Sequence, residues 1–177
     1  KKNAGILAIM ASFVFATIAA ANGLTDRLIT LPCDLRDRRQ LPSAGHFDLA
    51  VSNPPYFPAG GGKTAAGSRG IHRAELACTM EQLCAAAAYL LRSGGQFCLV
   101  YRTERLAELM ETLRRHRLEP KVLRFVQKNA ASAPSLLLMP CRKDGGTGLA
   151  VQPPLLLQND DGTETPELRR IYFKEKG

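Results

Sequence analysis

The sequence predicts an α/β fold built on a doubly wound, mostly parallel sheet, and three observations support this prediction. Short β-branched or aliphatic runs alternate with stretches in which apolar residues recur at helical spacing. The runs are apolar almost throughout, which is typical of parallel strands buried on both faces. The last two runs follow each other without a helix, so we expect an antiparallel hairpin at one edge of the sheet.

Each element can be assigned from its own residues. Two helices are predicted: Thr79 to Leu91, ending at Ser93-Gly94-Gly95, and Thr103 to His116, with Thr103 as its candidate N-cap. The predicted strands are Arg27–Cys33, Phe47–Asn53, Gln96–Tyr101, Val122–Gln127 and Ser135–Cys141.

The N-terminal segment has two interpretations. Ala4 to Ala21 carries no charge over 18 residues, which suits a short membrane span or a signal peptide. The alternative is a buried strand, Gly5–Ile9, followed by a helix from about Ser12 that stops at Asn22-Gly23. We favour the buried strand, because reduced thiols and the motif described below are typical of a cytoplasmic α/β domain. No membrane association is expected.

Length and charge limit the number of domains and the kinds of partner. The 177 residues fit one domain, 1–177, with a core of its own. Lys and Arg outnumber Asp and Glu by 24 to 16, giving a net charge of +8, and the surplus is clustered at Arg36–Arg39 and Arg114–Arg117. These clusters indicate either a polyanionic partner or simply solvated faces.

The numbers and spacing of cysteines and histidines limit the expected redox compartment and metal binding. The five cysteines are odd in number and include no C-x-x-C pair, which favours free thiols in a reducing compartment. The three histidines show no metal-ligand spacing with cysteines or carboxylates, so we expect no metal site.

The stretch FDLAVSNPPYF places Asn53, Pro54, Pro55 and Tyr56 at the end of a buried strand. In open parallel sheets, ligands bind at the carboxyl ends of the strands. Two prolines stop strand pairing and leave backbone carbonyls without local partners, while Asn53 adds an amide acceptor and Tyr56 a flat face. Such a site suits a planar ring that bears an amino group, such as a flipped-out adenine. The alternative is a turn that merely ends the strand.

SNPPYF preceded by FDLAV resembles motif IV of the amino-methyltransferases that use S-adenosylmethionine and act on adenine, guanine or glutamine nitrogens. Three further blocks are similar to the bacterial tRNA adenine-N(6) methyltransferases that modify the position next to the anticodon of a valine tRNA. The resemblance runs from Ala16 to Phe173 and implies a Rossmann-like class I methyltransferase sheet. The blocks are RGIHRAELACTMEQL (Arg69–Leu83), LEPKVLRFVQ (Leu118–Gln127) and PPLLLQNDDGTETPELRRIYF (Pro153–Phe173).

The resemblance also implies a site. Asp34, Leu35 and Asn53 are expected to bind the cofactor S-adenosylmethionine. Asn53, Pro54, Pro55 and Tyr56 form the catalytic group. The expected contacts to tRNA or another RNA come from Tyr56, which stacks on the base, and from Lys63, Arg69, Arg73 and the basic helix end at Arg114–Arg117.

The sequence departs from the family pattern in two places. Ala74 occupies the position where the family usually has His, and His72 lies two residues earlier. Before Gly45 the chain has only Gly5 and Gly23, and no acidic residue follows the strand at Gly5–Ile9. The fold is therefore expected to be N-terminally truncated, a domain without its first strand and glycine-rich loop. A phosphate-loop interpretation of Gly60–Thr64 fails because Phe57 stands where its first glycine is required.

The leading hypothesis is methyl transfer from S-adenosylmethionine to the exocyclic amine of adenine in tRNA. Within the same enzyme class, the alternatives are a guanine in rRNA and a glutamine in a protein factor. From a different class, the alternative is a non-catalytic RNA-binding fragment that keeps the basic surface without the glycine loop.

Overall fold

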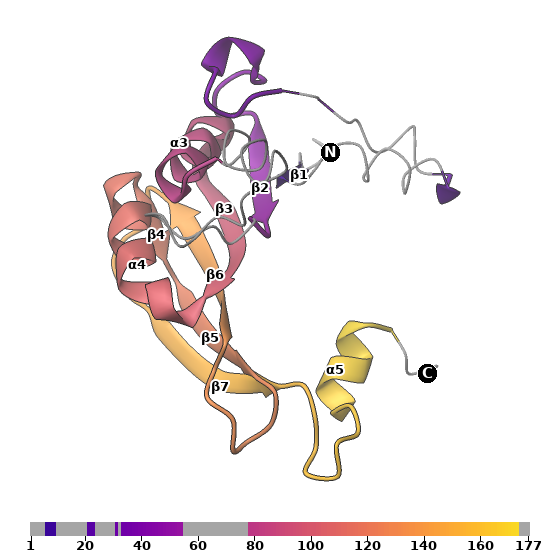
Figure 1. Cartoon of the computed structure of the whole chain (residues 1–177). Helices are drawn as coiled ribbons and strands as arrows, with labels where there is room; N and C mark the ends of the chain where they lie inside the picture. The colour runs from indigo at the N-terminus through magenta and orange to yellow at the C-terminus, as the bar shows by residue number, and fades with distance from the viewer. Residues whose placement is uncertain (1–5, 10–20, 24–30, 32, 55–77, 174–177) are drawn as a thin grey trace, which may run out of the picture.

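The computed structural model describes residues 6–9, 21–23, 31, 33–54 and 78–173 (Figure 1). The elements in chain order are β1 (Ile6–Ile9), the 3-10 helix η1 (Arg38–Gln40), β2 (Phe47–Ser52), α3 (Met80–Leu90), β3 (Leu91–Arg102), the 3-10 helix η2 (Thr103–Arg105), α4 (Leu106–Arg115), β4 (Leu118–Pro120), β5 (Val122–Gln127), β6 (Leu136–Lys143), β7 (Ala150–Leu156) and α5 (Pro166–Ile171).

The strands form one seven-stranded sheet in the order β1-β2-β3-β6-β5-β7, with β4 paired to β6. β1, β2 and β3 are parallel, β6 is antiparallel to β3, β4 and β5, and β7 is parallel to β5. Within the described part of the chain, β6 alone runs opposite to the other strands. The mostly parallel sheet and the β5–β6 hairpin are thus confirmed, although β6 inserts between β3 and β5 and β7 forms the outer strand.

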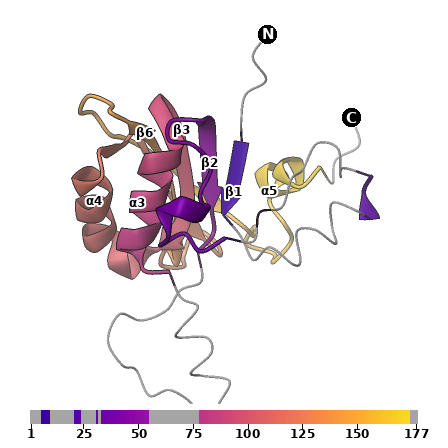
Figure 2. The same ribbon diagram turned by 90° about the horizontal axis from the view of Figure 1, so that it is seen from above.

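α3 and α4 cover one face of this sheet (Figures 1 and 2). On α4, Leu109 and Leu113 are fully buried, as the helical spacing of its apolar residues predicts. They meet inward-facing residues of β3 and β6 in one hydrophobic cluster that includes Phe97 and Leu137. α5 lies on the opposite side of the sheet (Figure 2).

The end of α3 differs from the prediction. The helix stops at Leu90, and Ser93-Gly94-Gly95 belongs to β3. There the register with β2 jumps from Phe47↔Leu91 to Leu49↔Gln96, so residues 92–95 form a bulge. Gly94 has a φ of 75°, and a Cβ on Gly95 would lie 2.9 Å from the carbonyl oxygen of Arg92. The two glycines are therefore explained by the bulge and not by a helix end.

The predicted N-cap at Thr103 is also wrong. Its hydroxyl donates to the carbonyl of Pro134 at 2.9 Å, and α4 begins only at Leu106, after the 3-10 turn η2. A long-range hydrogen bond has replaced the local cap.

Other elements differ at the ends of the chain. Of the predicted strand Arg27–Cys33, Leu31 and Cys33 are described and are not in a strand, and the rest lies outside the described residues. β7 was not predicted because Pro153 and Pro154 interrupt its pattern, but prolines are tolerated on an outer strand where no partner needs their amide hydrogens.

Part of the uncharged N-terminal segment is described. Ile6–Ile9 forms β1 and pairs with β2 up to Ile9↔Ser52, as the buried-strand interpretation predicts. Asn22 and Gly23 form a turn in which Gly23 has a φ of 63°. Residues 4, 5 and 10–20 lie outside the described part of the chain. None of the described helices combines the length and the apolar character that crossing a bilayer requires.

Candidate active site

The site is built at the carboxyl edge of the sheet, by which we mean the edge where the parallel strands β2, β3, β5 and β7 end. β2 is paired on both sides at its last residue, with Ile9 of β1 and Leu99 of β3. The pairing on both sides therefore fixes the position of the residues that follow the strand. Asn53 is exposed and Pro54 is half-buried directly after the last paired residue. An amide side chain and a proline carbonyl are thus presented at the edge where parallel sheets bind ligands.

Ser52 adds an unexpected feature to this strand end. Its side chain is only 5% exposed, and its hydroxyl is the only buried side-chain polar atom in the described residues without a hydrogen-bond partner. A buried hydroxyl left without a partner costs about 1–3 kcal/mol. The residue next to Asn53 therefore holds hydrogen-bonding capacity that the described part of the chain does not use.

The loop that carries Asp34 and Leu35 lies against the start of α3. Leu35 packs against the hydrophobic core together with Cys78 and Met80, the residues that flank the N-cap Thr79 of α3. α3 runs back from the carboxyl edge, since it ends at Leu90 where β3 begins at the opposite edge. The structure thus brings Asp34 and Leu35 to the same edge as Asn53, which is where sequence reasoning expects the cofactor.

Asp34 is an ionised acceptor that already has a partner. Its two carboxylate oxygens accept hydrogen bonds from the Arg36 side chain at 2.7 to 3.0 Å, and Oδ1 also accepts from the Arg36 backbone amide. These bonds to Arg36 lower the pKa of Asp34 to about 2. A ligand amino group that binds Asp34 must therefore share this carboxylate with Arg36 or displace its side chain.

The thiols near this loop are free. Burial, followed by the charge of Asp34, raises the pKa of Cys33 and of Cys78. Neither is activated as a thiolate, so the described residues offer no cysteine nucleophile here.

Several predicted site residues cannot be placed. Pro55, Tyr56, Lys63, Arg69 and Arg73 lie outside the described residues. Their roles stay predictions from the sequence. Among the described residues, no group of His, Cys, Asp and Glu side chains could hold a metal ion.

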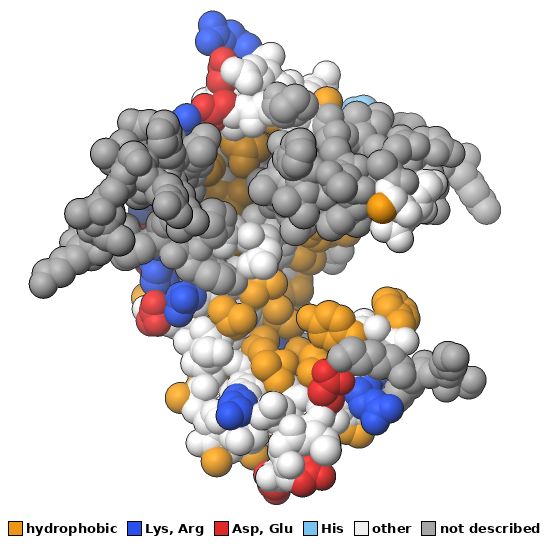
Figure 3. All heavy atoms as spheres, turned by 45° about the vertical axis from the view of Figure 1, so that its right-hand side comes forward, with side chains coloured by type: hydrophobic (Ala, Val, Ile, Leu, Met, Phe, Trp, Pro, Cys, Tyr) orange, Lys and Arg blue, Asp and Glu red, His pale blue; other side chains and the backbone are white. Residues whose placement is uncertain are grey.

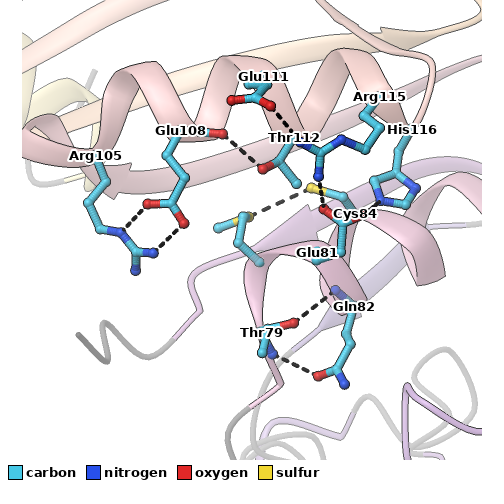
Figure 4. Close-up of polar contacts among 11 residues, drawn as sticks. Thr79, Glu81, Gln82, Cys84, Arg105, Glu108, Glu111, Thr112, Arg115 and His116 are labelled. Atoms are coloured by element: carbon cyan, nitrogen blue, oxygen red, sulfur yellow. Dashed lines mark hydrogen bonds and ion pairs between the residues drawn. The ribbon is translucent and has the colours of Figure 1, made fainter. Parts of the chain in front are cut away.

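The basic cluster Arg114–Arg117 does not join the site. It spans the last residues of α4 and the turn after it, at the opposite edge of the sheet, where β4 begins. Arg115 pairs with Glu81 at 2.9 Å and with Glu111 at 2.6 Å, and His116 also contacts Glu81 (Figure 4). Arg114 pairs with Glu119 at 3.4 Å and Arg117 with Asp144 at 2.9 Å. Carboxylates therefore neutralise this cluster. Its position at the opposite edge does not support the phosphate contacts predicted for it.

The cluster Arg36–Arg39 is similarly occupied. Arg36 pairs with Asp34 and Arg39 with Asp37, while Arg38 lies over the ring of Tyr89 at 5.2 Å. The solvated-face interpretation describes both clusters better than a dedicated polyanion surface.

Sequence reasoning missed the C-terminal helix α5. Thr165 caps it by accepting a hydrogen bond from the amide of Leu168, and Pro166 stands at its first position. This Thr-Pro pair is a recognisable helix start, so the signal was present in the sequence. Its position at the carboxyl edge could not be inferred, because β7 was not predicted.

Comparison with known proteins defines the fold. No protein-family model and no curated protein matches the chain. A predicted O-methyltransferase from Agrobacterium tumefaciens matches with a TM-score of 0.70 at 17% identity, over 94% of this chain and 75% of that one. The 1,6-didemethyltoxoflavin-N1-methyltransferase of Burkholderia thailandensis, solved with S-adenosylhomocysteine, matches with a TM-score of 0.50 at 16% identity, over 79% and 61%.

A candidate hemolysin from Lactococcus lactis also matches, with a TM-score of 0.52 at 11% identity over 85% of this chain and 84% of that one. The chain thus has the Rossmann-like fold of class I methyltransferases, as the sequence predicts. At these identities the likeness establishes the fold and leaves the reaction to be argued from the site.

Proposed function

We propose that the chain is an S-adenosylmethionine-dependent amino-methyltransferase that acts on the exocyclic amine of adenine in tRNA. The observation that carries the proposal is the position of Asn53-Pro54, directly after a strand paired on both sides, at the ligand-binding edge of a methyltransferase fold. The choice of adenine in tRNA rests on the resemblance of the sequence blocks.

The chemistry required of the chain is modest. The amine of adenine is a poor nucleophile because its lone pair is delocalised into the ring. The Asn53 side-chain oxygen and the Pro54 carbonyl can accept its two hydrogens and draw the nitrogen toward tetrahedral geometry. When bound, S-adenosylmethionine supplies a methyl group on a sulfonium, which is a good leaving group. Positioning by these two acceptors can therefore supply most of the effect without a strong base.

The described residues fit one end of the cofactor. Asp34 provides an ionised acceptor suited to an adenine amino group, and the half-buried Leu35 provides an apolar surface beside it. The sequence has no glycine between the end of β1 and Gly23, and it therefore has no glycine-rich loop there to hold the methionine end of the cofactor. Isothermal titration of S-adenosylmethionine into the purified chain tests this fit directly.

Asn53→Ala tests the proposed reaction. We expect the variant to lose transfer of labelled methyl groups to a tRNA pool while its far-UV circular dichroism is unchanged, because Asn53 is exposed. Asn53→Asp, which keeps an acceptor oxygen, is the matched control and should retain part of the activity. Full activity of Asn53→Ala would refute the proposal.

The substrate pools separate the alternatives within the enzyme class. Methyl transfer to rRNA or to protein, in place of tRNA, would favour a guanine or a glutamine as the acceptor. The absence of a glycine-rich loop directly after β1 favours a second candidate, a non-catalytic RNA-binding fragment. That candidate predicts salt-sensitive RNA binding without any affinity for S-adenosylmethionine.

A further inference from the structure

The C-terminal helix α5 and the two residues after it form an exposed apolar and basic surface at the carboxyl edge. Three exposed apolar residues end the described chain: Ile171 is 47% exposed, Tyr172 65% and Phe173 92%. Arg169 and Arg170 are also exposed, and neither forms an ion pair within the described residues. Together these five residues are called the α5 surface below. Figure 3 shows hydrophobic side chains gathered on this side of the molecule with basic side chains beside them.

This surface is held in place from both sides. The Thr165 hydroxyl donates to the carbonyl of Leu156, the last residue of β7, at 2.7 Å. Glu167 accepts a hydrogen bond from the Arg124 side chain of β5 at 2.7 Å, and the same Arg124 donates to the carbonyl of Pro153. α5 is therefore anchored to the end of β7 and to the middle of β5 and is not a free tail.

The strand order gives the distance from Asn53. β7, the strand that α5 follows, is separated from β2 by β3, β6 and β5, so four interstrand steps of about 4.8 Å set the ends of β2 and β7 roughly 19 Å apart along the same edge. Stacked nucleotides of one strand advance about 3.4 Å each, so this distance corresponds to about five or six nucleotides. A strand of RNA whose target base reaches Asn53 can thus also reach the α5 surface.

We propose that the α5 surface binds unpaired nucleotides that flank the target base, with Phe173 and Tyr172 stacking on bases and Arg169 and Arg170 contacting phosphates. Exposed aromatic rings next to cations are the combination that single-stranded nucleic acids require. The cations distinguish this surface from Arg114–Arg117, whose members are paired with carboxylates at the opposite edge. The inference rests on the proposed function in taking RNA as the substrate and Asn53 as the position of the target base.

RNA binding tests the inference without any methyl transfer. The probe is a fluorescein-labelled RNA hairpin with adenosines in its loop, titrated with the full chain at several salt concentrations. Arg169→Ala/Arg170→Ala should weaken binding and reduce the slope of log K against log salt by about 1.4, because each phosphate contact to a single strand contributes about 0.7. Arg114→Ala/Arg115→Ala is the matched control, since it removes the same charge from the opposite edge and should change the slope little.

Phe173→Ala should weaken binding about tenfold. Phe173→Leu, which keeps an apolar side chain but removes the ring, should weaken it similarly if stacking is the contact. Wild-type binding by both Phe173 variants and by the Arg169/Arg170 variant would overturn the inference, and so would a dimer in sedimentation that Phe173→Ala dissociates. The assay measures RNA binding without S-adenosylmethionine and without methyl transfer, so failure of this inference is separable from failure of the proposed reaction.

Discussion

Arg117, two residues after the end of α4, adopts a backbone conformation that residues other than glycine rarely adopt. Its φ is 59°, and its amide donates to the carbonyl of Arg114 at 2.9 Å, so it occupies the position just after the helix where glycine is usual. Its side chain pairs with Asp144, which has a φ of 56° and donates its amide to the Arg117 carbonyl at 2.8 Å. Two left-handed residues therefore face each other at the edge of the sheet opposite Asn53.

Comparing Arg117→Gly with Arg117→Ala isolates the backbone contribution. Both variants lose the same exposed ion pair, which contributes about 0.2–1 kcal/mol and cancels between them. The left-handed conformation costs a residue with a Cβ about 1–2 kcal/mol. Glycine lacks this cost but gains unfolded-state freedom that offsets about 0.4–1 kcal/mol. The glycine variant should thus be more stable than the alanine variant by roughly 0.8 kcal/mol.

Urea unfolding followed by circular dichroism measures this difference. A gap of about 0.8 kcal/mol corresponds to a shift in Tm of about 2–3 °C for a chain of this size. An alanine variant as stable as the glycine variant would refute the reasoning, because it would mean that the backbone at Arg117 is not strained.

Two further predictions follow from the charges and thiols. The pKa of Asp34, lowered to about 2 by Arg36, should return toward 3.8 in Arg36→Gln, as measured by NMR titration of the carboxyl carbon; an unchanged pKa would show that Arg36 is not its partner. Because the folded pKa is depressed, this contribution to stability is present above pH 4 and is lost as the pH falls toward 2, so the variant should lose less stability than wild type over that window. Burial raises the pKa of Cys84 to about 12 and also raises that of Cys141, so these two of the five thiols should resist Ellman's reagent at pH 8 in the folded protein and react in denaturant; rapid labelling of either would contradict its burial.

The basic clusters show how charge counts mislead. The sequence places Arg114–Arg117 together, and a run of like charges indicates a polyanion site only if no carboxylates fold against it. Glu81 and Asp144, both far away in the sequence, do so here. Arg169 and Arg170 are not among the phosphate contacts that the sequence predicts, yet the topology places them on the edge that carries Asn53.

Local patterns determined much of this protein. The apolar run Phe47–Ser52, the spacing of Leu109 and Leu113, and the Asn53-Pro54 strand end are properties of consecutive residues, so periodicity and proline chemistry were enough to find them. The mostly parallel sheet followed from the alternation of such segments, and the hairpin from the missing helix between β5 and β6.

The tertiary structure alone decided features that depend on residues distant in the chain. Gly94 and Gly95 lie in a bulge because the register with β2 shifts there. The Thr103 hydroxyl donates to the carbonyl of Pro134 and does not cap its own helix. β7 tolerates two prolines because its outer side has no partner within the described residues. The sequence by itself determined the strands β2, β3, β5 and β6, the helices α3 and α4, and the residues that end β2. Which of those residues meet at one edge was decided by long-range pairing, because hydrogen bonds and ion pairs between distant segments exist only once the sheet has assembled.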